Sequence, residues 1–219
     1  MAREDTPEDE FELLQRWQAG GDGSGRAGEI LFDRYFPAIA RFFQSKSIDA
    51  VEDLVQETFL AVQRARDRIQ KSSFRNYLFG TAHNLLRAHL RRRHDDAFDS
   101  AQMSVLDLCP GISSLIAATD QQRVLQLALQ RVPLDDQIVV ELRFWEGMTV
   151  PEIAEVLEVP LGTVSSRLRR AIKRLEGTIA EIEASPALLD MTLRDFSAWK
   201  NDLHEIIGLD DDDDDDRAK

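Results

Sequence analysis

The stretch TVPEIAEVLEVPLGTVSSRLRRAIKRLE, residues 149–176, determines how the rest of the chain is interpreted. Thr149 and Glu152 have the spacing of a capping box, in which a hydroxyl and a carboxylate satisfy each other's unpaired backbone N–H groups. Apolar residues then recur at helical spacing as far as Leu157. Pro160 ends this first helix and sets the backbone for a second one. The stretch therefore predicts a helix-turn-helix.

The second helix of this motif has one apolar face and several polar ones. Its apolar stripe is Val164, Leu168, Ala171, Ile172 and Leu175. Small side chains allow a helix to approach a major groove closely, and guanidinium groups reach guanine edges and phosphates. The candidate groove-facing residues are therefore Thr163, Ser165, Ser166, Arg167, Arg169, Arg170 and Lys173. The alternative is an ordinary amphipathic hairpin with a solvated charged face, because such patterns also occur in proteins that bind no DNA.

Composition limits the function classes. The net charge of the 219 residues is −13, and the aspartate run 210–216 with the two cations after it contributes −5 of this. An acidic chain binds DNA weakly unless its cations are local, so we expect a partner that helps to hold the DNA. One cysteine, Cys109, excludes an internal disulfide and a cysteine zinc cluster. We expect no membrane span, no secretory signal, no cofactor and a cytoplasmic location.

A second basic segment lies in the amino-terminal half. Residues 75–93, RNYLFGTAHNLLRAHLRRR, contain five arginines and no acid. Aromatic, amide and cationic side chains interleave there, as in proteins that hold single-stranded DNA. Packing explains the aromatic residues equally well, so both readings stay open. The histidines of this segment have no metal-binding partners at a useful spacing, and we expect no metal site.

Strand signals are scarce, so the sequence predicts an all-α fold. We expect a first helical domain over residues 1–93, with a helix over 52–69 whose N-cap is Asp49. A change of composition over 94–118, including Pro110-Gly111, indicates a flexible linker. A second helical domain covers 119–176, and residues 177–219 form a carboxy-terminal extension.

The segments 52–62, 75–93 and 152–175 together resemble the extracytoplasmic-function (ECF) group of bacterial RNA polymerase sigma factors. The resemblance implies two helical domains, sigma region 2 and sigma region 4, which contact core polymerase and promoter DNA. It places region 2 on the β′ clamp coiled-coil and at the minus-10 element, and region 4 on the β flap and at the minus-35 element. A separate anti-sigma factor is a further partner that the family implies.

The resemblance also assigns residues to these roles. Core polymerase contacts would come from Asp53, Leu54, Gln56, Glu57 and Phe59. Minus-10 contacts would come from Ser72, Ser73, Phe74, Tyr77, Asn84, Arg87 and Arg91. The minus-35 contacts are the groove-facing residues of the helix-turn-helix given above. No catalytic residue is implied, and no nucleophile, phosphate loop or metal cluster is apparent, so we do not expect an enzyme.

Two alternatives to a sigma factor remain at the level of sequence. A stand-alone helix-turn-helix regulator would bind duplex DNA as a symmetric dimer without polymerase. The second alternative is an enzyme that acts on nucleic acid, although the only candidate catalytic groups in the sequence are scattered carboxylates.

The extension raises a question of its own. Its apolar residues Leu189, Leu193, Phe196, Leu203 and Ile207 recur at helical spacing, with Trp199 alongside. Such a helix could dock on either domain and bring the aspartate run over a basic helix. A solubilising tail is the alternative.

Overall fold

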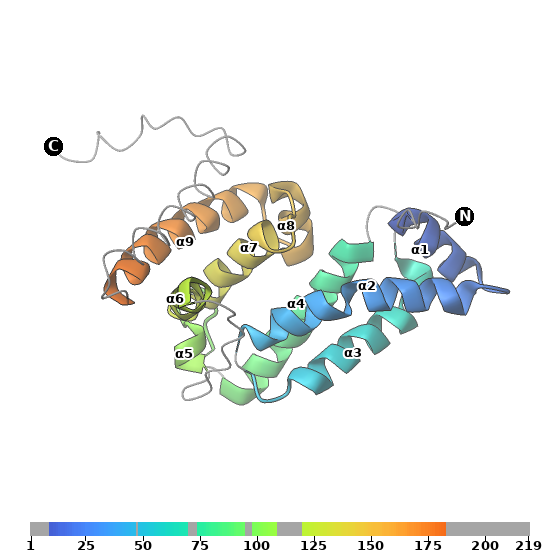
Figure 1. Cartoon of the computed structure of the whole chain (residues 1–219), viewed down its shortest axis with the longest axis horizontal. Coiled ribbons are helices and arrows are strands. Elements are labelled where there is room, and N and C mark those ends of the chain that lie inside the picture. The colour runs from blue at the N-terminus through green and yellow to red at the C-terminus, as the bar shows by residue number, and fades with distance from the viewer. Residues whose placement is uncertain (1–8, 47, 70–73, 95–97, 109–119, 183–219) are drawn as a thin grey trace.

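The computed structural model describes residues 9–46, 48–69, 74–94, 98–108 and 120–182. Within these ranges the secondary structure is helical, apart from an isolated bridge between Ser104 and Pro133, which confirms the predicted all-α class. The helices form two units that lie side by side (Figure 1), one of α1–α4 and one of α5–α9. None of the described helices is long and apolar enough to span a membrane. The extension beyond Ile182, including the apolar pattern and the aspartate run, lies outside the described residues.

The amino-terminal unit is organised around a cluster of aromatic rings. Phe74 lies at its centre, with ring centroids 5.7 Å from Tyr35 and 6.0 Å from Trp17. Gly28 lets Trp17 approach α2, because a Cβ there would lie 2.5 Å from the indole nitrogen. The helices are α1 (Glu10–Ala19), α2 (Ser24–Gln44), α3 (Val51–Arg64), the short 3-10 helix η1 (Arg66–Arg68) and α4 (Phe74–His94).

The carboxy-terminal unit is built on α7, which is buried along almost its whole length. The long α9 packs against α6, α7 and α8, and its apolar stripe is buried as the sequence predicts, with Val164, Leu168 and Leu175 fully inaccessible. The helices are α5 (Val105–Leu108), α6 (Asp120–Leu129), α7 (Leu134–Phe144), α8 (Val150–Leu157) and α9 (Leu161–Ile182).

Three boundaries differ from expectation. The N-cap of α3 is Ala50, and no side chain caps it, so the prediction of Asp49 as the cap was wrong; its carboxylate bonds Arg93 at 2.8 Å instead. The last turns expected of that helix are replaced by η1. In contrast, α9 continues through Gly177, because burial of Ile179 offsets the cost of about 1 kcal/mol for a helical glycine.

Part of the segment expected to be a flexible linker is ordered against the carboxy-terminal unit. Asp107 accepts hydrogen bonds from the backbone and hydroxyl of Ser104 at 2.8 and 2.7 Å, which holds the start of α5 and lowers the pKa of Asp107. The backbone N–H of Leu106 donates to Gln130 at 3.2 Å. The described residues 98–108 therefore belong structurally to the second unit.

Polar contacts join the two units. Arg75 at the start of α4 donates to Glu152 of α8 at 2.7 Å, and the amide of Asn76 donates to Glu155 at 3.0 Å. Where α4 crosses α8, a Cβ on Gly80 would lie 3.4 Å from the carbonyl oxygen of Val156. The two units thus form a closed arrangement in which α8 covers one face of α4.

Candidate nucleic-acid interface

The helix-turn-helix is formed by α8 and α9, and both halves of the predicted capping box are present. The backbone N–H of Glu152 donates to the Thr149 hydroxyl at 3.4 Å, and the Glu152 carboxylate accepts from the backbone N–H of Thr149 at 2.7 Å. These bonds, with nearby Arg75, lower the pKa of Glu152 against the opposing effect of burial. The helix ends at Glu158, which has a left-handed φ of 53° and so lets the chain turn sharply into α9.

The side chains of α9 predicted to face the major groove fall into two groups. Ser166, Arg169, Arg170 and Lys173 are exposed, whereas Thr163, Ser165 and Arg167 are only partly exposed. The exposed group lies opposite the buried stripe, so it is the part of α9 that a DNA groove can reach. This placement supports the predicted orientation of the helix.

Two acids at the start of α7 hold three arginines of α9. Asp136, whose side chain is 1% exposed, accepts from Arg170 at 2.9 Å and from Arg174 at 2.7 Å. Its hydrogen bond raises the pKa of Arg170. Asp135 pairs with Arg167 at 2.6 Å. The sequence analysis missed both acids, since adjacent aspartates in the first turn of a helix are common for dipole reasons alone.

Asp135 also links the two candidate DNA-binding helices. Its other carboxylate oxygen lies 3.9 Å from the Arg87 guanidinium of α4. His83, one turn before Arg87, is buried in the same region, and burial with the nearby arginines lowers its pKa to about 4. Arg87 and Arg167 are therefore drawn toward the junction of the two units.

The other predicted minus-10 residues of α4 divide by face. Tyr77, Asn84 and Arg91 recur every seven residues and are exposed together on one side of the helix. Phe74 is fully buried in the aromatic cluster, so this structure does not present it to DNA. Ser72 and Ser73 lie outside the described residues.

A groove between α2 and α3 includes two of the five predicted polymerase contacts. It has a volume of about 530 Å³, and Gln56 and Phe59 line it. Asp53 and Glu57 are exposed on α3 but do not line the groove, and Leu54 is buried beneath α3. Two further apolar residues at the groove, which the sequence analysis did not single out, are more exposed than their type favours: Phe36 at 54% and Leu60 at 40%. The sequence signal that could have identified Phe36 and Leu60 is an apolar residue at a position where the helical spacing places polar side chains.

Comparison with protein-family models gives two matches in the order of the two units. Residues 31–95 match the sigma-70 region 2 family, and residues 122–175 match the sigma-70 region 4 family. Curated relatives cover both regions at once. The chain is 26% identical over 179 residues to an ECF RNA polymerase sigma-E factor of Haemophilus influenzae, covering 76% of this chain and 93% of the relative. It is 27% identical over 180 residues to the sigma-E factor of Escherichia coli K12, covering 76% and 92%.

Solved structures share the fold. CnrH, determined in complex with the cytosolic domain of CnrY, superposes with a TM-score of 0.58 at 22% identity, over 80% of this chain and 99% of CnrH. The sigma factor RpoE of Bartonella quintana, determined with the anti-sigma factor NepR, gives a TM-score of 0.55 at 23% identity, over 69% and 96%. With region 2 and region 4 both matched, and with cationic side chains exposed on α4 and α9, the chain belongs to the ECF group of bacterial RNA polymerase sigma factors.

Proposed function

We propose that this sigma factor recruits core polymerase through the α2–α3 groove and reads promoter DNA with the exposed faces of α4 and α9. The observation that carries the proposal is the exposed stripe on each helix, Tyr77, Asn84 and Arg91 on α4 and Ser166, Arg169 and Lys173 on α9. On a chain whose two units match regions 2 and 4, these stripes correspond to minus-10 and minus-35 reading.

The stripe on α4 suits an unpaired strand. A tyrosine ring provides a stacking surface, an amide reads a base edge and an arginine binds the backbone. The stripe on α9 suits a duplex, because short side chains precede the cations along the helix. The factor thus selects the promoter while the catalytic work stays with the polymerase, in the cytoplasm where that enzyme operates.

The groove supports the polymerase contact through its apolar floor and acidic edge. Phe36 and Leu60 expose apolar surface there, and two exposed acids of the lining, Asp33 and Glu52, supply negative charge. An apolar contact edged with acids fits a basic helical partner such as the β′ clamp coiled-coil, with region 4 contacting the β flap. An anti-sigma factor, like the NepR bound to RpoE of Bartonella quintana, would compete for such surfaces.

Reconstitution with bacterial core polymerase tests the function. We expect promoter-dependent transcripts that are lost in the Arg169→Ala variant. Tight binding of a palindromic duplex without polymerase, and no stimulation of the polymerase, would instead identify a stand-alone regulator.

A matched pair of variants tests the groove. Leu60→Asp places a charge in the groove, whereas Phe11→Asp places one on α1, at a residue with the same 40% exposure. We expect co-purification with core polymerase to be lost only in Leu60→Asp. Equal retention in both variants would show that the polymerase contact lies elsewhere.

A further inference from the structure

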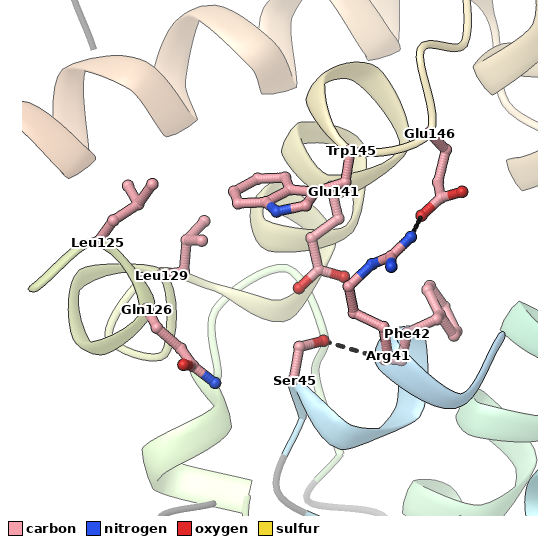
Figure 2. A pocket seen from close by; sticks show the side chains of 9 residues that line it. All are labelled: Arg41, Phe42, Ser45, Leu125, Gln126, Leu129, Glu141, Trp145 and Glu146. Carbon is pink, nitrogen blue, oxygen red and sulfur yellow. Dashed lines mark hydrogen bonds and ion pairs between the residues drawn. The ribbon is translucent and has the colours of Figure 1, made fainter. Parts of the chain in front are cut away.

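A small cavity lies at the junction of the two units, and the proposed DNA and polymerase contacts do not use it. Its volume is about 220 Å³, and both units line it (Figure 2). The amino-terminal unit contributes the carboxyl end of α2, and the carboxy-terminal unit contributes α6 and α7. The lining residues used below are Arg41, Phe42, Leu125, Leu129, Trp145 and Glu146.

The surface of this cavity is mostly apolar, with polar atoms from Ser45, Gln126 and Glu141 in its lining and an ion pair on one side. Phe42 and Leu129 are buried, whereas Trp145 is 39% exposed, and Figure 2 shows its indole ring extending toward the side of Leu125 and Leu129. Arg41 and Glu146 close one side through an ion pair of 2.7 Å. The volume is below the range of about 300–1,000 Å³ typical of small-molecule sites, so it suits a single large side chain better than a free ligand.

The chain itself carries a segment that fits. Helix α9 packs along α6 and α7, two of the helices that line the cavity, and is described as far as Ile182. The apolar pattern begins at Leu189, and the six intervening residues reach at most about 20 Å when extended. Seven residues of helix add about 10 Å, so Phe196, near the centre of the pattern, can lie anywhere up to roughly 30 Å from the end of α9.

We propose that residues 189–207 of this chain dock as a helix over the cavity, with Phe196 seated between Leu129 and Trp145. An aromatic anchor in an apolar pocket is the usual centre of such a contact. The stripe around Phe196 then covers the exposed faces of Leu125 and Trp145. Because the tether makes the contact intramolecular, even a weak interaction is populated.

Seating the helix there has a mechanical consequence. The cavity exists only while α2 of one unit lies beside α6 and α7 of the other, so the docked segment stabilises the closed arrangement. The extension thereby acts as a built-in partner of the region 2–region 4 junction. This contact forms in the free chain and does not depend on the polymerase or on promoter DNA.

Photo-cross-linking of the full chain tests the contact. Phe196 is replaced by the aromatic cross-linker p-benzoylphenylalanine, and the joined peptides are identified by mass spectrometry. We expect cross-links within one chain to residues 125–129 or 141–146. The same probe at Ala198, about 200° around the helix, should give none to these peptides.

Other outcomes overturn the proposal. Cross-links between isotopically distinct copies would mean that a second copy fills the cavity, and cross-links elsewhere, or none, would mean that the segment does not occupy it. A Leu125→Asp change in the cavity wall, in a chain with unchanged helical circular dichroism, should abolish the cross-link. Persistence of the same cross-link would exclude the cavity as its seat. Transcription with core polymerase, measured separately, reports on the proposed function alone.

Discussion

Replacing Glu141 by glutamine removes one half of a buried charge pair that holds the two units together. The partner is Lys46, at the end of α2, whose side chain is 1% exposed and whose ammonium bonds the Glu141 carboxylate of α7. The ammonium also lies 3.8 Å from the centre of the Phe42 ring and 2.9 Å from the Ser45 hydroxyl. Burial lowers the pKa of Lys46, while Glu141 opposes that shift.

The expected magnitude follows from leaving this cation without its carboxylate. Breaking a buried ion pair by removing one partner costs about 3–5 kcal/mol. Since Lys46 and Glu141 belong to different units, separation of the units hydrates the ammonium without unfolding either one. The cost therefore falls on closure, and the ratio of closed to open molecules should drop roughly 10²- to 10⁴-fold.

Distance measurements by electron spin resonance between labels on the two units report this ratio. Cysteines at the exposed positions Gln63 and Ala180, with Cys109 changed to serine, carry the labels. The Lys46→Met/Glu141→Leu double variant is the control, because an apolar pair of similar size is neutral or stabilising at such sites. A closed population in Glu141→Gln equal to that of the unaltered chain would refute the role assigned to the pair.

Three further predictions concern the interior of the units and the DNA-binding face. The pKa of His83 is lowered to about 4, so between pH 4 and pH 6.5 the unfolded chain binds a proton at His83 that the folded chain does not. The free energy of unfolding should therefore be highest above pH 6.5 and fall by up to about 3 kcal/mol as the pH drops to 4. In the His83→Leu variant, urea titrations at several pH values should no longer show this pH dependence of the free energy of unfolding. Arg169→Ala should weaken minus-35 binding by about 1–3 kcal/mol and reduce its salt dependence by about one counterion, measured by fluorescence anisotropy at several salt concentrations. Gly28→Ala should lower thermal stability by about 1–3 kcal/mol through collision with Trp17, whereas Gly25→Ala, with open space around it, should not.

Local sequence signals predicted the elements well where one segment contains the whole signal. Thr149 and Glu152 form their capping box because both partners are three residues apart, and the buried stripe of α9 follows from spacing alone. The cap at Asp49 failed for the opposite reason. Arg93, which is 44 residues away in sequence, competes for its carboxylate.

The junction of the two units was beyond sequence reasoning. Arg75 and Glu152 lie 77 residues apart, and Lys46 and Glu141 lie 95 apart. Each looks like an ordinary solvated charge on its own helix, and one sequence contains no covariation to pair them. The buried position of Phe74 likewise depends on three helices meeting around one ring.

The crossing of α4 over α8 at Gly80 makes this one position a graded control of the whole molecule. A methyl group there would only reach ordinary van der Waals contact with the carbonyl of Val156, so alanine fits. Valine, leucine and phenylalanine have successively larger side chains, which would push α4 and α8, and with them the two units, further apart. A short series of substitutions at this single codon would thus open the junction in steps, while the exposed stripes of α4 and α9 stay unchanged.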